Sequence, residues 1–337
     1  MSTEVETQPS IRQRRVPGWY SEGFRILSQQ LCFLLAIIWI NGVVIRMTVR
    51  DSNDLLAPLF YATPWPVLAV LTLVFLRYFW RQPVAVFSII FVAHMLGAAW
   101  IMEDWHTPQL SREPADLRVL QWNVARPIRW RPEIVSQVRN SNADVVAISE
   151  PIPVSDGGKL IERIRAAEKD WRAAFPDYSF ELRGEDFLCL IRGEVLNRRL
   201  GILFSGSRYA LYDVRVKERA MRILQVDIDA RPIHPRRKAF AALVEIVGTL
   251  SDQPLILIGD FNTPRESVHL EPLQKNLQHA WLTAGAGCAE TWPSFLPVLS
   301  LDQIWCGYGL SAVRCQHGVT FRSDHRPVLA ELRFAAP

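Results

Sequence analysis

The chain has 337 residues, of which 49% are apolar, and a formal net charge of +4 at pH 7. This length accommodates a large α/β domain with an appendage, and the apolar share is high for a soluble protein. The five cysteines lack C-x-x-C spacing, which argues against a zinc site. Cys306 and Cys315 could form a disulfide outside the cytoplasm, with two buried thiols as the equal alternative.

Three long apolar stretches lie before residue 105, at residues 26–47, 65–80 and 84–101. About 20 apolar residues span a bilayer as a helix, so the sequence predicts three transmembrane helices. The alternative is a set of buried core helices, which the near absence of charge in these stretches disfavours. A cleaved signal peptide fits poorly, because the first 20 residues are long and polar and no small-residue cleavage site follows the first stretch.

The basic residues predict the orientation of these spans. Arginines precede the first span and lie between the second and third, whereas Glu103, Asp104 and His106 follow the third. Loops rich in arginine stay in the cytoplasm, although Arg46 and Arg50 in the first loop weaken the contrast. The sequence therefore predicts a cytoplasmic tail at 1–25, a membrane anchor at 26–105, a linker at 106–115, and an extracytoplasmic catalytic domain at 116–337.

Beyond the anchor, short apolar runs alternate with helical patterns. The expected strands are residues 117–124, 144–149, 187–192, 201–204, 221–228, 255–259, 301–305 and 328–332. The expected helices are residues 132–140, 159–175, 236–250 and 271–281. This alternation predicts a mixed α/β domain with a large sheet.

Polar residues stand at the ends of several of these expected strands. Asn123 and Glu150 end two of them, and Gly-Asp-Phe-Asn at 259–262, Leu-Asp-Gln-Ile-Trp at 301–305 and Ser-Asp-His-Arg-Pro at 323–327 flank others. A lone carboxylate after a strand is usually a turn former, a helix cap or a surface ion partner. The whole ordered set, spread over about 200 residues, instead favours a catalytic site.

On these motifs, the chain from Asp116 onward resembles the endonuclease/exonuclease/phosphatase superfamily, which is deoxyribonuclease I-like, and within it the bacterial membrane-anchored type. The ordered motifs GDFN, LDQIW and SDHRP carry the resemblance, which covers about two thirds of the chain. It implies an α/β fold with two β-sheets packed face to face and helices on the outer sides, a four-layer sandwich. It also implies hydrolysis of phosphoester bonds.

Phosphodiester cleavage requires charge neutralisation, an activated water and help for the leaving group. Glu150 and Asp324, with Asn123 near them, suit a hard cation such as Mg2+, for which Mn2+ is a possible substitute. Asp260 would orient or deprotonate the attacking water, and Asn262 would donate its amide to the phosphate. His325 would donate to a phosphate oxygen, with Asp302 holding its ring. By resemblance, these residues match the superfamily's metal, water-positioning and His-Asp positions.

The chain departs from the superfamily pattern at two places. Asp227 and Asp229 stand where members often carry a histidine, and His234 follows a few residues later as a possible replacement. Ala125 stands where many nucleases have an acidic residue. Arg126, Arg236, Asp229 and His234 are candidates for contacts to the substrate phosphate, and the alternative for the arginines is a set of solvated charges at helix starts.

The sequence therefore predicts a membrane-anchored, Mg2+-dependent phosphoesterase, in the first place a phosphodiesterase or nuclease. One alternative is a sphingomyelinase-like enzyme that acts on phospholipid headgroups, since fold does not select the substrate. Another is a catalytically inactive, membrane-tethered binding module, which the departure at Asp227 and Asp229 supports. The expected partners are a phosphoester substrate, either nucleic acid or lipid headgroup, and the bilayer around the N-terminal helices.

Overall fold

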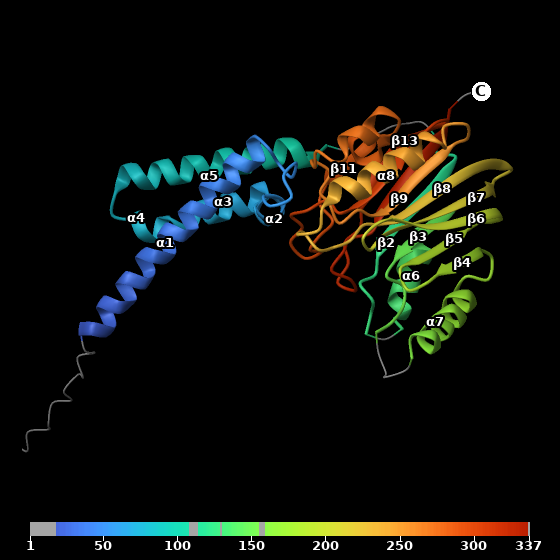
Figure 1. The fold of residues 1–337 in the computed structure, drawn as a ribbon, viewed down its shortest axis with the longest axis horizontal. Helices are drawn as coiled ribbons and strands as arrows, with labels where there is room; N and C mark the ends of the chain where they lie inside the picture. The colour runs from blue at the N-terminus through green and yellow to red at the C-terminus, as the bar shows by residue number, and fades with distance from the viewer. Residues whose placement is uncertain (1–17, 108–113, 129, 155–158, 336–337) are drawn as a thin grey trace, which may run out of the picture.

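The computed structural model describes residues 18–107, 114–128, 130–154 and 159–335. An elongated group of helices forms the N-terminal part, and a β-rich domain forms the rest (Figure 1). The predicted linker at 106–115 falls largely on residues 108–113, which lie outside the described residues. The short strand β1 (Trp105–His106) precedes it and pairs with the β-rich domain, so the last helix of the N-terminal part leads directly into a sheet.

The N-terminal part consists of five helices: α1 (Gly18–Met47), α2 (Ala57–Ala62), α3 (Trp65–Val74), α4 (Leu76–Phe79) and α5 (Pro83–Asp104). Two of its stretches, Glu22–Met47 and Pro83–Asp104, are long and apolar enough to cross a membrane. The second predicted span is shorter, at Trp65–Phe79, and is interrupted at Phe75 between α3 and α4. Proline in the first turn begins both α3 and α5, where its missing N–H would have no helical partner.

The β-rich domain contains two mixed sheets. The eight-stranded sheet has, in spatial order, β1, β11 (Gly285–Cys288), β13 (Leu310–His317), β14 (Val328–Phe334), β2 (Leu117–Asn123), β3 (Val145–Ser149), β5 (Phe187–Ile191) and β4 (Ser179–Arg183). The six-stranded sheet has β10 (Gln278–His279), β12 (Asp302–Cys306), β9 (Leu255–Asp260), β8 (Arg219–Asp227), β7 (Ser207–Val216) and β6 (Gly193–Phe204).

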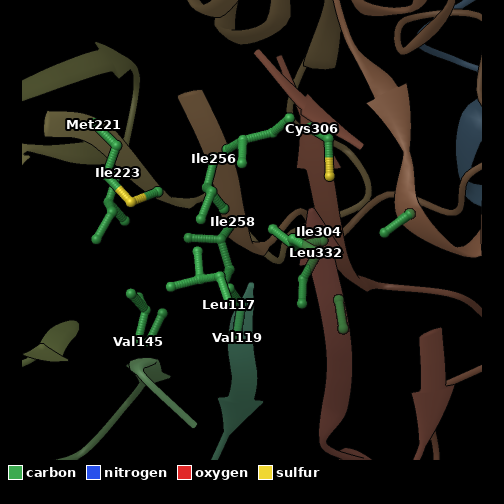
Figure 2. Packing of buried hydrophobic residues seen from close by; sticks show 14 of the residues in the cluster. Leu117, Val119, Val145, Met221, Ile223, Ile256, Ile258, Ile304, Cys306 and Leu332 are labelled. Atoms are coloured by element: carbon green, nitrogen blue, oxygen red, sulfur yellow. The ribbon is translucent and has the colours of Figure 1, made fainter. Parts of the chain in front are cut away.

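Alternation along the strands divides their apolar residues between two cores. On β9, Ile256 and Ile258 belong to the core between the sheets, which Figure 2 shows, while Leu255 and Leu257 belong to an outer core with α8 (Arg236–Gly248). Because successive side chains on a strand point to opposite faces, one strand serves both layers. Truncating Ile258 to alanine would cost about 2 to 5 kcal/mol of stability.

The eight-stranded sheet is covered in the same way. On β2, Val119 enters the core between the sheets, whereas Trp122 packs with residues of α6 (Pro132–Asn140) and α7 (Leu160–Ala174), such as Ile134 and Trp171. The result is two mixed β-sheets with helices flanking them, which confirms that part of the sequence prediction.

Helix prediction succeeded for α6, α7 and α8 but was wrong for residues 271–281. That segment contains a 3-10 helix, η1 (Glu271–Lys275), then β10, and then the start of a separate short helix, α9 (Ala280–Ala284). The reason is tertiary: Gln278 and His279 pair with Cys306 and Trp305 of β12 and extend the sheet. The sequence analysis also missed β4, β7, β11 and β13, in which buried residues are mixed with more exposed ones.

Candidate active site

The ends of strands from both sheets meet at one edge of the domain. Asp260 ends β9, where it lies in register with Asp302 on one side and Asp227 on the other. Asn123 ends β2 in the other sheet, and its Nδ2 donates to Asp260 Oδ2 over 2.8 Å. A hydrogen bond between two predicted site residues therefore joins the sheets at this edge.

A cavity of about 510 Å³ opens at this edge. Six of the seven predicted catalytic and metal residues line it: Asn123, Glu150, Asp260, Asn262, Asp324 and His325. The seventh, Asp302, contacts His325 without lining the cavity itself. This volume is in the range of a small-molecule site, and residues from all five motifs converge on it.

The backbone at this edge is held in uncommon conformations. Gly259 of the GDFN motif has a φ of +153°, and a Cβ added there would stand 1.9 Å from the carbonyl oxygen of Val226. Glu150 and Asn262 have φ values of 55° and 45°, which non-glycine residues rarely adopt. Such conformations cost free energy and cluster at functional sites, because the surrounding structure must enforce them.

His325 and Asp302 form a buried pair, with 2.7 Å between His325 Nδ1 and Asp302 Oδ2. Burial lowers the pKa of His325, but the carboxylates of Asp302 and Asp260 outweigh it and raise that pKa to about 10. The Thr291 hydroxyl accepts from the backbone N–H of Asp302 and fixes its position. The imidazole is therefore a cation at neutral pH, and its Nε2 remains free of this carboxylate bond.

Asp260 is a buried carboxylate that titrates near neutrality. Burial raises its pKa, the His325 cation opposes this, and Asp302 adds to it, so that the pKa lies at about 7. Its oxygens accept from the amide of Asn123 and from the backbone N–H of Asn262, the latter over 2.8 Å. A fixed carboxylate with a pKa near 7 is well matched to accepting a proton from water.

Glu150, Asp324 and Asn123 form a second group of oxygen donors on the same cavity. Glu150 Oε1 accepts from Arg126 Nη1 over 2.8 Å, and Asp324 Oδ2 accepts from Trp292 Nε1 over 3.1 Å. Burial raises the pKa of Glu150, with the Arg126 guanidinium opposing this shift. Within the described part of the chain, each of these two carboxylates accepts a side-chain hydrogen bond through one oxygen only, so the donor set fits a hard divalent cation.

A further group has potential ligand atoms within 4.8 Å of one another, namely Asp260, Asp302 and His325. The hydrogen bond between His325 and Asp302 already uses one oxygen of Asp302. Both oxygens of Asp260 accept hydrogen bonds, one from Asn123 and one from Asn262. These bonds are typical of a proton-handling group, and they favour Glu150 and Asp324 as the place for a cation.

The four predicted phosphate-contacting residues separate in space. Arg236 lines the cavity and is 3% exposed, whereas Arg126 lines a neighbouring cleft. Asp229 and His234 contact each other over 3.1 Å and do not line the cavity. Hydrogen bonds from Arg231 hold the pKa of Asp229 well below its usual range.

Asp227, not Asp229, is the acidic residue nearest the catalytic strand ends, since it is in register with Asp260. Burial raises the pKa of Asp227 well above its usual value, and the carboxylates of Asp260, Asp186 and Glu150 add to this. Of the two acids at the position of the expected histidine, Asp227 is therefore the one whose neutral form is favoured. A neutral carboxyl can donate a hydrogen bond, as a histidine would.

The sequence analysis did not identify one side of the cavity. Pro58, Tyr61 and Ala62, all on α2 of the N-terminal helical part, line the cavity together with the motif residues. These residues lie between two apolar stretches and carry no catalytic pattern. No signal in the sequence could have placed them beside residues 200 positions away.

The fold and this edge define a two-sheet α/β protein of the phosphoester-hydrolase class. The chain belongs to the endonuclease/exonuclease/phosphatase family, whose family model matches residues 120–325. The membership confirms the predicted resemblance to the endonuclease/exonuclease/phosphatase superfamily. No curated protein matches the chain.

Solved structures of the same fold come from distant organisms. An endonuclease/exonuclease/phosphatase from Bacteroides vulgatus is 18% identical, with a TM-score of 0.52, and the match covers 66% of this chain and 100% of that one. The mannosyl-6-phosphatase Bt3783 of Bacteroides thetaiotaomicron is 16% identical over 65% of this chain and 100% of its own, with a TM-score of 0.51. TDP2 of D. rerio, complexed with single strand DNA product, is 14% identical over 64% and 98%, with a TM-score of 0.52. At these identities the likeness establishes the fold alone.

Proposed function

We propose that the chain is a membrane-anchored, Mg2+-dependent hydrolase of phosphoesters, in the first place a phosphodiesterase. The observation that carries this proposal is the convergence of two groups on one cavity. Asp260, His325 and Asp302 can handle protons there, and Glu150, Asp324 and Asn123 can offer oxygen ligands. A binding module would not require a charged imidazole with a buried orienting carboxylate, so the inactive alternative is disfavoured.

In the proposed mechanism, Glu150 and Asp324 would hold the cation, with the Asn123 side chain beside them. When bound, Mg2+ would neutralise charge on the phosphate oxygens. Asp260 accepts the proton of the attacking water, since a pKa of about 7 leaves about half of this carboxyl ionised at neutral pH. His325 donates to a phosphate oxygen as charge develops, and Asp302 keeps the ring oriented and protonated.

Arg236 completes the proposed phosphate site. Its Nη2 donates to the carbonyl oxygen of Asn262 over 3.1 Å, and its buried Nε has no hydrogen-bond partner. Among the residues that the structure describes, no carboxylate forms an ion pair with Arg236, although it is almost fully buried. A buried cation without a counter-ion favours an anionic ligand, and a phosphate is such a ligand.

Two of the similar structures are a mannosyl-6-phosphatase and TDP2 complexed with single strand DNA product. Nucleic acid therefore remains one candidate substrate, and a phospholipid headgroup remains the other. The activity itself can be tested before the substrate is known. We expect the full chain in detergent micelles to hydrolyse bis-p-nitrophenyl phosphate with Mg2+ or Mn2+, and EDTA to abolish the reaction.

The matched control for this assay is Asp260→Asn, which keeps the shape of the side chain and removes its basicity. We expect it to lower kcat by about a hundredfold or more. Hydrolysis that persists equally in EDTA or in Asp260→Asn would contradict the proposal.

We also propose the predicted arrangement in the membrane: a cytoplasmic tail at 1–25, a three-span anchor at 26–105, a linker at 106–115 and an extracytoplasmic catalytic domain at 116–337. Contacts of the first loop support the number of spans. Arg50 Nη2 lies 2.6 Å from Glu271 Oε1, and Arg46 Nη1 lies 2.9 Å from Glu266 Oε1. These contacts support a first loop on the same side of the membrane as the catalytic domain, and such an arrangement requires an even number of crossings between them.

An even number of crossings supports Trp65–Phe79 and α5 as the second and third membrane spans. Arg46, in the last turn of α1, and Arg50, in the loop after it, both pair with acidic residues, which accounts for two arginines on the proposed extracytoplasmic side. A fusion experiment tests the arrangement: alkaline phosphatase fused to the C-terminus should be active, and a fluorescent protein exported there by the general secretory route should stay dark. The opposite pair of results would place the catalytic domain in the cytoplasm.

A further inference from the structure

The wall of the cavity formed by α2 is held in place by the catalytic domain itself. Asp51 is fully buried; it accepts from the Ser267 hydroxyl over 2.5 Å and from the backbone N–H of Val268 over 3.0 Å. The Tyr61 hydroxyl donates to the same carboxylate over 2.8 Å. One carboxylate thus binds both the tyrosine of α2 and a loop of the catalytic domain.

Neighbouring contacts fix the same junction. Arg46, 6% exposed, donates to the backbone carbonyls of Phe60 within α2 and of Thr63 directly after it, and to the Glu266 side chain. His269 Nε2 lies 3.0 Å from the carbonyl oxygen of Asp51. Buried, charge-assisted hydrogen bonds are among the stronger polar contacts in proteins, so α2 has a defined position over the cavity.

At this position Tyr61 faces the proposed phosphate site. The guanidinium carbon of Arg236 lies 5.8 Å from the centre of the Tyr61 ring, and both residues line the cavity with Asp260 and His325. Pro58 and Ala62 extend the apolar surface beside Tyr61. A phosphate held by Arg236 would therefore have an apolar wall directly beside it.

With the proposed spans, the anchor would also bring this wall to the surface of the bilayer. In Figure 1, α2 lies at the end of the helical part that meets the catalytic domain, and α4 lies at the far end. With the proposed spans, α2 occupies the loop that leaves the membrane on the side of the active site. A substrate that approaches along this wall comes from the lipid surface.

Exposed apolar side chains continue the surface next to the cavity. A second cleft shares Ala125 and Asp324 with the first, and its lining includes Ile128, Phe295 and Phe321, which are 66%, 74% and 83% exposed. Arg131 and Arg322 line the same cleft. Exposed aromatic and aliphatic residues with arginines beside them are typical of protein surfaces that contact anionic lipid interfaces.

We propose that α2 is part of the active site, with Tyr61 as a specificity-determining residue, and that the substrate is a phosphoester carried by a membrane lipid. The inference rests on the proposed phosphoesterase function. Tyr61, Pro58 and Ala62 pack against the apolar group bonded to the phosphate, while Arg236 holds the phosphate itself. Nucleic acid, whose neighbouring groups are polar sugars, gains nothing from such a wall.

The test compares two substrates with one leaving group, hexadecyl p-nitrophenyl phosphate and methyl p-nitrophenyl phosphate, on the full chain in neutral detergent micelles with Mg2+. We expect kcat/KM to be at least about tenfold higher for the hexadecyl ester, because each buried methylene adds to binding. Tyr61→Ala should reduce this preference at least about fivefold, mainly through KM.

Two control variants distinguish the effect of the Tyr61 ring from the effect of its hydrogen bond to Asp51 and from the effect of truncating a tyrosine elsewhere. Tyr61→Phe keeps the ring but loses the bond to Asp51, and it should retain the preference within about twofold. Tyr78→Ala makes the same truncation in α4, away from the cavity, and should also retain it. An unchanged preference in Tyr61→Ala would overturn the proposal, and so would a single-stranded oligonucleotide hydrolysed with a higher kcat/KM than the hexadecyl ester.

A binding measurement distinguishes failure of this inference from failure of the phosphoesterase proposal. Calorimetry with hexyl phosphate and inorganic phosphate needs no catalysis, and the ratio of the two affinities should fall at least about fivefold in Tyr61→Ala. If no ester is hydrolysed but this ratio falls, the proposed activity is wrong and the apolar wall stands. If hydrolysis occurs and the ratio is unchanged, the wall is wrong and the activity stands.

Discussion

Two buried histidines in the catalytic domain show how the same side chain receives opposite charge states. His325 at the cavity and His279 at the edge strand β10 are each 6% exposed. The pKa of His325 is raised to about 10, whereas the pKa of His279 is lowered to about 3. Equal burial therefore does not decide the charge, and the difference must come from the neighbours of each ring.

The neighbours of His325 are carboxylates, Asp302 and Asp260, which favour the cation. The pKa of His279 is lowered first by burial and then by the Arg265 guanidinium, with a further contribution from His317 when that ring is protonated. Its Nδ1 accepts from the backbone N–H groups of Trp281 and Leu282 over 3.2 and 3.4 Å, which only a neutral ring can do. One histidine is arranged for proton donation and the other for capping α9.

The largest expected effect concerns the charged pair. If His325 donates to the phosphate as charge develops, His325→Ala should lower kcat at least about a hundredfold with little change in KM. Asp302→Asn should lose a similar amount, and the double variant should lose hardly more than either single one, because the two residues act as a unit. Steady-state kinetics on the three variants checks this.

A lower melting temperature with an unchanged rate per folded molecule would make the His325–Asp302 pair structural, like His279. Full additivity of the two losses in kcat would also contradict the proposal, because it would show that His325 and Asp302 do not act as a unit. His279→Asn is the matched control, since it alters an equally buried histidine away from the cavity and should leave kcat within about twofold.

The next effect concerns the proposed metal ligand. Glu150→Gln keeps the size of the side chain and removes its charge, so we expect the fold to persist and the Mg2+ concentration for half-maximal activity to rise about tenfold or more. Mg2+ titrations of activity, with melting curves as a control, measure this. Unchanged Mg2+ dependence at unchanged stability would remove Glu150 from the metal site and leave Asp324 without its partner.

A smaller effect should appear in stability against acid. Because the folded pKa of His279 lies below the ordinary value of 6.5, its contribution is complete above pH 6.5 and is lost as pH falls from 6.5 toward 3. Between pH 7 and pH 5 this amounts to about 2 kcal/mol. His279→Asn keeps a side-chain acceptor for the cap and should abolish about that part of the acid loss.

Chemical unfolding followed by tryptophan fluorescence at pH 7 and pH 5 provides the measurement. The ionisation of His325 affects the free energy of unfolding in the opposite direction. Its stabilising contribution is complete below pH 6.5 and is lost as pH rises toward 10. An acid loss that is the same in His279→Asn as in the unaltered chain would show that the neutral ring is not required for the cap.

The smallest effect is expected at two thiols in the core between the sheets. Cys306 and Cys315 are free and buried, and burial raises the pKa of Cys306 to about 12. We therefore expect negligible reaction of either with a thiol reagent at pH 8 in the folded chain, and rapid reaction on denaturation without reductant. If these two cysteines reacted after denaturation only once a reductant was added, the result would show that they are joined by a disulfide, which is the alternative given in the sequence analysis.

Local sequence was sufficient to predict the family and to select candidate site residues, because each motif is a local combination of an apolar strand and the polar residue at its end. Asn123, Glu150, Asp260, Asp324 and His325 could be selected in this way, and the structure places them on one cavity. The three helices α6, α7 and α8 were likewise predictable from local periodicity.

Which further residues lie at the candidate site depends on tertiary structure. Asp227 replaced Asp229 as the acid near Asp260 because the register of β8 and β9 turns one of them toward the strand end and leaves the other to Arg231. Tyr61 lies on the cavity because Asp51 and Ser267 join segments more than 200 residues apart. Pairing register and long-range contacts depend on how whole layers pack, which a local pattern of residues does not encode.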